Sequence, residues 1–416
     1  MGLDNVEVLF LCHRIPYPPN KGEKIRAWHI LSHLSTLHDV HLGCLVDDPQ
    51  EFSYRKELSN VVASLGCFGI RPTIQKARAL TRIYTGRPLS LDFFYNRGLQ
   101  RWVDEKLSRH SIQGVYVYSS AMATYLDQTA TADCVRVMDM VDIDSEKWRT
   151  YASHCSWPLR RLYEREGDAL FAFEKHVASR FDKTLFVSEA EATRFAELAP
   201  ECRSRVGWLE NGVDLDWFSE KGSSTNPYVP GTDNIVFTGT MDYWPNVDAV
   251  TWFANHIFPR IRQRRPRAQF HVVGAKPTRA VLRLRRLSNV HVTGRVPDVR
   301  PYLSHARVAV APLRIARGVQ NKILEAMAMG LPVVATPEAF EGLRGVAGRD
   351  LLVARRPDEM ASVILVIIEG GHAGVGEAAR QAVERNYRWS ETLQPLDSLF
   401  QRLLKQHGSC TETHCH

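Results

Sequence analysis

Short apolar runs alternate with stretches of helical periodicity along most of the chain. Residues 6–12 form the first run, whose β-rich content predicts a buried strand. Residues 24–35 follow, with apolar side chains at the spacing of an amphipathic helix. Further strands are predicted at residues 40–45, 115–118, 135–138 and 184–187. Because strands and helices keep alternating, the pattern indicates a parallel sheet with helices on both faces.

A polar stretch rich in turn residues interrupts this alternation. Residues 210–214 have the composition of a turn, and residues 221–233 are rich in Gly, Ser, Pro and Asn, as linkers are. The alternation then restarts, with a helix over residues 247–258 and strands at residues 235–238, 270–273, 290–293, 308–311 and 332–335.

We therefore expect an α/β protein with two doubly wound, parallel-sheet domains and a hinge between them. The predicted N-terminal domain comprises residues 1–215, and the second domain comprises residues 216–385. Residues 386–416 are expected to form a C-terminal helix and tail that packs back toward the N-terminal domain. Ligands of such sheets bind at the carboxyl ends of the strands, so a cleft between the domains is the expected site.

The cysteine content and the absence of membrane signals favour a cytoplasmic protein. The eight cysteines form no C-x-x-C pair and no zinc-finger spacing, so reduced, buried thiols are expected. The chain opens without the basic segment of a signal peptide, and its best apolar run, residues 361–368, is too short for a membrane span. Metal ligands do occur in the tail, but a frayed terminus with chance ligands is the favoured interpretation of His407, Cys410, His414, Cys415 and His416.

Positive charge is concentrated in two arginine-rich segments. The net charge is +7, and much of the excess lies in residues 260–267 and 279–286. A solvated helix face is the commonest explanation of such segments. A patch for anionic lipid headgroups would suit an enzyme with a lipid-linked acceptor, acting at the inner face of the cytoplasmic membrane. Nucleic acid ranks last as a partner, because no recognition motif accompanies the charge.

Residues 318–334 combine a glycine turn, a helix of about three turns, a second glycine and a buried strand. Gly318 allows the backbone to approach a diphosphate, and a helix N-terminus presents N–H groups and a dipole to an anion. Lys322 in the first turn adds a positive charge, and Glu325 shares its face of the helix. A carboxylate there can accept hydrogen bonds from two ribose hydroxyls. Taken alone, an ordinary surface Lys–Glu pair would be the better explanation.

The same segment resembles the donor-binding signature of family 4 glycosyltransferases, most specifically over residues 324–334. Further similarities follow in that family's order: a glycine-rich loop at residues 18–22, a strand-end serine at Ser188, and loops at residues 210–214, 237–246 and 293–296. The resemblance covers residues 6–400 and is closest to sugar transferases associated with bacterial exopolysaccharide and exosortase (PEP-CTERM) gene clusters. It implies the GT-B fold, in which two Rossmann-like domains face each other across a cleft.

The resemblance also implies a reaction and a set of contacts. A retaining hexosyltransferase would move a sugar from a nucleotide-diphosphate sugar to a hydroxyl of a glycan or lipid-linked acceptor. Its leaving phosphate oxygen would deprotonate the acceptor on the same face, while cations and helix N–H groups stabilise the diphosphate. No metal or other cofactor is needed in this scheme. The implied nucleotide-sugar contacts are Gly22, Gly239, Arg295, Val296, Gly318, Asn321, Lys322 and Glu325.

Two positions depart from the family pattern. Arg317 stands where the first glutamate of the family's E-x7-E motif belongs, and Thr240 stands where its Arg-and-Lys pair begins. Two standard phosphate and sugar contacts are therefore missing or rebuilt. We expect Lys322, with Arg295 or Arg314, to supply the positive charge, and surface solvation is the alternative for both arginines.

Acidic residues follow one predicted strand of the N-terminal domain. A carboxylate from Asp139 or Asp142 can orient the transferred sugar or the acceptor hydroxyl. Asp142 is therefore an expected catalytic residue, together with Lys322 and Glu325. The alternative is an acidic loop before a helix that Ser145 caps.

The loop at residues 18–22 precedes a helix with Lys24 and Arg26 in its first turns. These residues are expected to shape the acceptor and diphosphate side of the cleft. The structural alternative is a tight turn between a strand and a helix.

Two other classes of function stay open. A nucleotide-sugar 2-epimerase has the same architecture, but the carboxylate and histidine set of epimerases is not evident near the donor segment. A non-catalytic partner subunit is suggested by the missing first glutamate and opposed by the intact Lys322 and Glu325.

Overall fold

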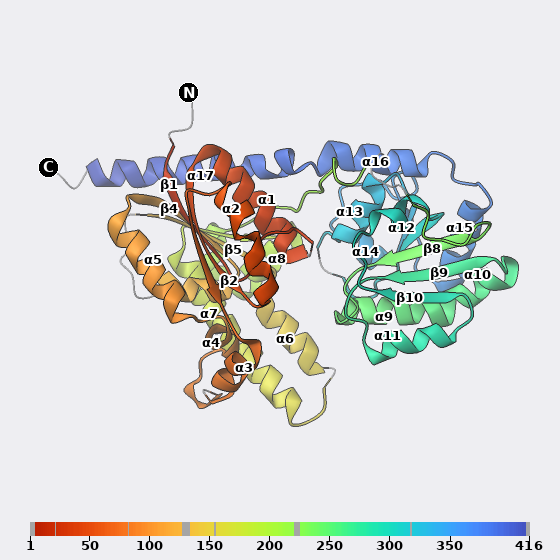
Figure 1. Ribbon diagram of the computed structural model, residues 1–416, viewed down its shortest axis with the longest axis horizontal. Coiled ribbons are helices and arrows are strands. Elements are labelled where there is room, and N and C mark those ends of the chain that lie inside the picture. The colour runs from red at the N-terminus through yellow and green to blue at the C-terminus, as the bar shows by residue number, and fades with distance from the viewer. Residues whose placement is uncertain are drawn as a thin grey trace. The chain divides into compact units, whose positions relative to one another are not determined.

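Two compact units make up the chain (Figure 1). The computed structural model describes residues 5–20, 22–81, 83–126, 134–153, 155–219, 225–316 and 318–412. Unit 1 consists of Met1–Glu210 and Leu393–His416, and unit 2 consists of Asn211–Thr392. The first division lies near the boundary expected at residue 215. The C-terminal helix α17 (Trp389–Glu412) passes from unit 2 into unit 1 at residue 393.

Unit 1 is built on a parallel sheet of seven strands among the described residues, in the order β3-β2-β1-β4-β5-β6-β7. The strands are β1 (Glu7–Cys12), β2 (Asp39–Val46), β3 (Ser64–Gly69), β4 (Ile112–Tyr118), β5 (Val135–Val141), β6 (Lys183–Phe186) and β7 (Val206–Trp208). All five predicted strands lie within this set. The two edge strands, β3 and β7, were not predicted: β3 is only partly buried and lacks a continuous apolar run, and β7 has only three residues.

Helices cover both faces of this sheet, with α1 and α5 on opposite sides of it (Figure 1). Trp102 of α5 packs where Gly43 and Gly66 lack side chains, since a Cβ at either glycine would come within 2.8 Å of the indole. Unit 1 contains α1 (Gly22–Leu37), α2 (Arg55–Ser59), α3 (Pro72–Thr81), α4 (Leu89–Phe93), α5 (Arg97–Arg109), α6 (Asp144–Ser153), α7 (Leu159–Arg180) and α8 (Glu189–Leu198), with 3-10 turns η1 (Pro49–Tyr54), η2 (Ile83–Thr85), η3 (Ser120–Leu126) and η4 (Pro200–Arg205).

The last part of α17 packs on unit 1. His33 Nε2 lies 2.6 Å from Asp397 Oδ1, and the ring of Phe400 lies against Gly114 of β4, where a Cβ would come within 2.6 Å of it. The ring of His38 also lies 6.0 Å from that of Phe400. These contacts explain why residues 393–412 belong to the first unit.

Unit 2 repeats the architecture with six parallel strands in the order β10-β9-β8-β11-β12-β13, counted over the described residues. They are β8 (Asp233–Thr238), β9 (Ala268–Val273), β10 (Val290–Gly294), β11 (Val308–Ala311), β12 (Val333–Ala335) and β13 (Leu352–Val353). The five predicted strands correspond to β8–β12, whereas the two-residue β13 was not predicted. A continuous apolar core fills the space between this sheet and its helices.

The helices of unit 2 connect these strands. The predicted helix at residues 247–258 is α9 (Trp244–Trp252), which continues through a π-helical turn, η6 (Phe253–Ile257), into α10 (Phe258–Arg264). The others are α11 (Arg279–Arg283) with the 3-10 turn η7 (Leu284–Arg286), α12 (Arg300–Ser304), α13 (Asn321–Ala328), α14 (Pro337–Phe340), α15 (Pro357–Ile368) and α16 (Val375–Asn386).

The two units confirm the predicted α/β class with two doubly wound parallel sheets. In each sheet the strand order reverses once, beside β1 in unit 1 and beside β8 in unit 2. Such a reversal is where ligands of doubly wound sheets bind. Within the described part of the chain, no helix has the length and apolar content needed to cross a membrane.

Candidate functional site

The predicted donor residues gather at the strand-order reversal of unit 2. There β8 pairs with β11, and the chain leaves β8 toward β9 but leaves β11 toward β12. The two loops therefore diverge, and the carboxyl ends of these strands are where a doubly wound sheet binds its ligand. Gly239 begins the first loop, and Gly318 lies in the second, three residues before the start of α13.

Lys322 connects the start of α13 to the loop that follows β8. Its Nζ donates a hydrogen bond of 2.5 Å to Asn246 Oδ1 and lies 4.8 Å from the centre of the Phe237 ring. The Asn246 amide in turn donates to the carbonyl of Thr240 at 2.8 Å. Asn246 was part of the motif noticed in the sequence, but no role for it was predicted.

The ionisation of Lys322 and Glu325 is shifted toward neutrality. Burial raises the pKa of Glu325 to about 7, and the charge of Lys322 opposes that shift. Burial also lowers the pKa of Lys322 to about 8, against the attraction of Glu325. Both groups therefore change their charge near neutral pH, which is a property of functional sites more often than of surface pairs. The surface-pair alternative is disfavoured by this burial.

Three glycines with positive φ end the three strands β8, β9 and β10. The φ angles are 152° at Gly239, 154° at Gly274 and 78° at Gly294. A Cβ on Gly274 would lie 1.7 Å from the carbonyl oxygen of Gly239, so the two loops approach more closely than any side chain allows. Gly274 was missed in the sequence, although a glycine directly after an apolar strand was the available signal.

The start of α13 has the features of an anion site. Gly318 has φ of 61°, and the N-cap residue Gln320 makes no side-chain capping hydrogen bond. The first N–H groups of such a helix can bind an anion. Asn321 Oδ1 accepts a hydrogen bond of 3.2 Å from Asn211 Nδ2, which fixes the first residue of the helix. Arg317, the departure from the family motif, lies outside the described residues.

The two arginines considered as extra cations differ in their surroundings. Arg314 forms a bidentate ion pair with Asp248, at 3.0 and 2.5 Å, and lies 5.5 Å from the centre of the Trp252 ring. Its charge is therefore already compensated on the surface. Arg295 is exposed directly after Gly294, whereas Val296 packs against the core of unit 2.

Parts of the two arginine-rich segments make internal contacts. Arg285 donates to the carbonyl of Val292, and Arg262 donates to the carbonyl of Ser288 at 3.1 Å. These guanidinium groups stabilise the local fold of unit 2 as well as contributing charge to its surface.

The N-terminal domain departs from expectation at Asp139 and Arg26. Both are buried, and they form a bidentate ion pair with N···O distances of 2.9 and 3.2 Å. Tyr116 donates a third hydrogen bond to Asp139, and Arg26 also donates to the carbonyl of Leu209 at 2.7 Å. The expectation that Asp139 or Arg26 faces a ligand is wrong, because each is enclosed with a partner that neutralises it.

Lys24 follows the same pattern. Its ammonium group is buried and lies 2.7 Å from Glu51 Oε1. It therefore joins α1 to the turn after β2 and does not present a charge to an acceptor. Gly22 is the first residue of α1, so the glycine-rich loop does lead directly into that helix.

Asp142 follows β5 and remains accessible. Its carboxylate is 30% exposed and lies 2.7 Å from Lys147 Nζ, which also contacts Asp144 at 3.0 Å. Ser145 does not cap α6, as the alternative had it, but lies within the helix and donates a 2.5 Å hydrogen bond to Glu174. The structure leaves Asp142 as the accessible carboxylate of the pair that the sequence singled out.

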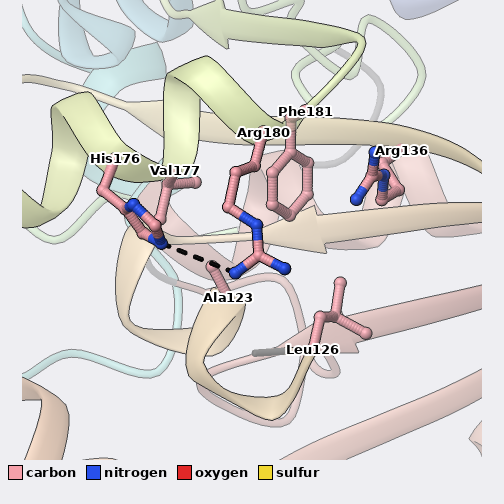
Figure 2. Close-up of a pocket in the computed structure, with 7 residues that line it drawn as sticks. All are labelled: Ala123, Leu126, Arg136, His176, Val177, Arg180 and Phe181. Atoms are coloured by element: carbon pink, nitrogen blue, oxygen red, sulfur yellow. Dashed lines mark hydrogen bonds between the residues drawn. The ribbon is translucent and has the colours of Figure 1, made fainter. Parts of the chain in front are cut away.

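A cavity in unit 1 does not qualify as a ligand site. It lies between α7, the strand β5 and the turn η3 (Figure 2). Arg180 Nη1 lies 3.5 Å from His176 Nε2 beside it. Its volume of about 10 Å³ is enough for one water molecule at most.

Comparison with known proteins first defines the class of fold. The chain has the GT-B fold and is similar over nearly its whole length to solved glycosyltransferase structures. HepE of Anabaena, solved in complex with UDP and glucose, aligns with a TM-score of 0.64 and 14% identity, over 96% of this chain and 100% of that one. A glycosyltransferase of Rickettsia africae aligns with a TM-score of 0.65 and 13% identity, over 97% of this chain and 99% of that one. Sucrose-phosphate synthase of Thermosynechococcus elongatus aligns with a TM-score of 0.69 and 14% identity, over 97% of this chain and 100% of that one.

A family model matches part of the second unit. Residues 232–370 match the family described as glycosyl transferases group 1. This range contains the carboxyl ends of β8 and β11, with Gly239, Lys322 and Glu325. The comparison with curated protein sequences finds no match.

Proposed function

We propose that this protein is a retaining glycosyltransferase of family 4 that moves a hexose from a nucleotide-diphosphate sugar to a hydroxyl acceptor. The observation that carries the proposal is the half-buried pair of Lys322 and Glu325 at the carboxyl edge of unit 2. The family match over residues 232–370 and the shared fold with HepE, solved with UDP and glucose, support it.

On the donor side, each residue has a role that its position supports. The diphosphate lies at the start of α13, where Gly318, Asn321 and Lys322 provide backbone access and a positive charge. Glu325 accepts hydrogen bonds from the ribose hydroxyls. Gly239 lies beside Asn246 and Lys322, which places the end of β8 next to the proposed diphosphate contact.

The nucleobase is assigned to the loop after β10, and the leaving group to the cations of unit 2. Arg295 and Val296 contact the base at the end of that strand. The bond between the sugar C1 and the diphosphate oxygen breaks, and a bond from C1 to the acceptor oxygen forms on the same face. The acceptor proton passes to the leaving phosphate oxygen, and Lys322 stabilises the charge that develops there.

In unit 1, Gly22 and Asp142 complete the proposed set. Gly22 begins α1, whose N-terminus faces the carboxyl edge of its own sheet, and the accessible Asp142 orients the transferred sugar or the acceptor hydroxyl. A metal ion is not required for this chemistry.

The biological setting is proposed from the resemblance alone. It is bacterial exopolysaccharide biosynthesis associated with PEP-CTERM systems, in the cytoplasm. A glycan or lipid-linked acceptor, and peripheral contact of the arginine-rich segments with anionic lipid at the inner face of the membrane, belong to the same proposal. No role for nucleic acid is proposed.

Thermal unfolding of the purified chain with saturating UDP, GDP, ADP or dTDP tests the donor site. One of these ligands should raise the melting temperature, and Lys322→Ala and Glu325→Ala should each abolish the shift. Glu377→Ala is the matched control, because this carboxylate is exposed on α16 and is not among the residues proposed to bind the donor. Failure of all four nucleotides to stabilise the protein would contradict the proposal.

The same preparation separates the other classes of function. Incubation with UDP-N-acetylglucosamine alone would yield an epimerised sugar if the protein were a 2-epimerase. A non-catalytic subunit would bind nucleotide without releasing sugar from any donor. A transferase releases sugar slowly by hydrolysis and retains the anomeric configuration of the donor.

A further inference from the structure

A second cluster of polar side chains lies in unit 1, at the amino-terminal edge of its sheet. Glu7 begins β1, His41 lies near the start of β2, and His110 follows α5 just before β4. One ligand atom from each of these three residues lies within 4.8 Å of the others. The carboxyl edge of the same sheet carries Asp142, so the cluster is separate from the proposed chemistry.

Strand pairing brings the three residues together. β1 and β2 pair in parallel, with Leu9 opposite His41, so Glu7 and His41 lie on the same face of the sheet two positions apart. β4 runs on the other side of β1, with Ile112 opposite Glu7, which places His110 beside them. The two imidazole rings lie 4.6 Å apart, at 47° to each other.

His41 is a buried side chain whose second nitrogen has no partner. It is only 4% exposed, and its Nδ1 is 2.8 Å from Ser64 Oγ on the neighbouring strand β3. Its Nε2 makes no hydrogen bond in the described structure and points toward Glu7 Oε1, 3.8 Å away. That separation is too long for a hydrogen bond, so the buried nitrogen loses its contact with water without gaining a partner in exchange.

The three atoms all lie within 4.8 Å of one another, which is close enough for one metal ion to draw them together. Zinc binds imidazole nitrogen and carboxylate oxygen at about 2.0–2.1 Å, so tetrahedral ligand atoms lie about 3.3 Å apart. Glu7 Oε1 and His110 Nδ1 are already 3.3 Å apart, and a small side-chain rotation brings the 3.8 Å pair to the same distance. The Ser64 contact lets His41 Nδ1 carry the proton, which leaves the Nε2 lone pair for the metal.

One neighbouring cation has to move. Lys106 Nζ lies 3.3 Å from His110 Nε2, the nitrogen that carries the proton when Nδ1 binds a metal. The ammonium also lies 5.6 Å from the centre of the Trp102 ring. Moving further over that ring relieves the conflict and keeps a favourable contact for the charge.

We propose that Glu7, His41 and His110 bind one divalent metal ion of the zinc class, with water as the fourth ligand. Two histidines and one carboxylate are a ligand set that zinc prefers. The ion would join β1, β2 and the α5–β4 connection, three segments far apart in the sequence. The proposal is independent of the proposed transferase activity.

Calorimetric titration of the full-length, chelator-stripped protein with Zn²⁺ tests the site. The tail offers competing ligands, so the titration is made in a background carrying Cys410→Ser, His414→Asn, Cys415→Ser and His416→Asn. We expect about one ion per chain. His41→Gln, and the milder Glu7→Gln and His110→Gln at half-exposed positions, should each weaken binding at least about tenfold. The control His291→Gln, in a stacked histidine pair of unit 2 without a carboxylate, should leave it unchanged.

Cobalt substitution identifies the ligands independently of affinity. Co²⁺ in the proposed site should give the visible absorption of a four- or five-coordinate nitrogen and oxygen environment. That spectrum should disappear in Glu7→Gln and His110→Gln proteins that keep the wild-type circular dichroism. The proposal is overturned if no zinc binds, if binding is undiminished in these variants, or if a thiolate charge-transfer band assigns the ion to cysteine.

Discussion

Lys322 Nζ donates a 2.5 Å hydrogen bond to Asn246 Oδ1 and thereby connects two loops that diverge from β8 and β11. The partners are 76 residues apart in the sequence and meet because β8 and β11 are neighbours in the sheet. Because burial lowers the pKa of Lys322 to about 8, the Asn246 oxygen also helps to keep the ammonium charged. Asn246 is therefore a positioning residue for the proposed diphosphate contact.

We expect Asn246→Ala to weaken binding of the stabilising nucleotide diphosphate about tenfold, because a hydrogen bond to a charged group contributes about 1.5–3 kcal/mol. Isothermal titration of wild type and variant measures the change. Asn255→Ala is the matched control, since Asn255 is exposed in η6 and donates to the carbonyl of Thr251 one helical turn away. Equal affinities for the Asn246 and Asn255 variants would show that Lys322 needs no positioning.

The raised pKa of Glu325 predicts a pH-dependent cost to stability. Its pKa is about 7 in the folded protein and near 4.5 in the unfolded chain, so folding favours the protonated form. The stability that protonated Glu325 contributes is fully present below pH 4.5 and is lost as the pH rises through 7. Glu325→Gln, which imitates the protonated form, should match wild type at pH 4.5 and be more stable by about 3 kcal/mol at pH 8.

Urea unfolding at the two pH values measures this difference. Glu377→Gln, at an exposed position of α16, serves as the control and should show no such dependence. The attribution to Glu325 is wrong if the Gln variant differs from wild type by the same amount at both pH values. Nucleotide binding should show the opposite trend, because the ribose contact needs the carboxylate.

Most of the fold could be predicted from local patterns alone. The strands at the centre of each sheet, such as β1 and β8, are continuous apolar runs because helices cover both of their faces. The edge strands β3, β7 and β13 lack that signal, since they are short or partly exposed. The pairing of Lys322 and Glu325 was also predictable, because a three-residue spacing on a helix is a local relationship.

The misassigned residues are those whose partners are distant in the sequence. Asp139 and Arg26 looked functional because charged residues beside strand ends often bind ligands, but their ion pair spans 113 positions. The contact between Gly274 and Gly239 likewise depends on how β8 and β9 pair. No periodicity within one segment reports such contacts, which follow from the topology of the sheet.

Gly274→Ala should disrupt the glycine contact at the carboxyl edge of unit 2. A Cβ at Gly274 would lie 1.7 Å from the carbonyl oxygen of Gly239, and φ of 154° is strained for alanine. We expect a loss of more than about 2 kcal/mol in the free energy of unfolding, and weaker nucleotide binding. Gly370→Ala is the control: its φ is 88° with no atom within 4 Å, so backbone strain of about 1 kcal/mol is its whole cost. Similar losses in both variants would contradict the close approach.

Substitutions of Asp139 and Asp142 should have different effects, the first on stability and the second on catalysis. Asp139→Asn leaves the buried Arg26 guanidinium without its counter-charge, so we expect about 3–5 kcal/mol of destabilisation in urea unfolding. Asp142→Asn removes only a partly exposed contact with Lys147 and should change stability by less than about 1 kcal/mol. If Asp142 orients the sugar or the acceptor as proposed, this second variant should lose at least about tenfold in transfer rate while binding nucleotide normally. A fully active Asp142→Asn protein would exclude that role and leave catalysis to the donor-side residues.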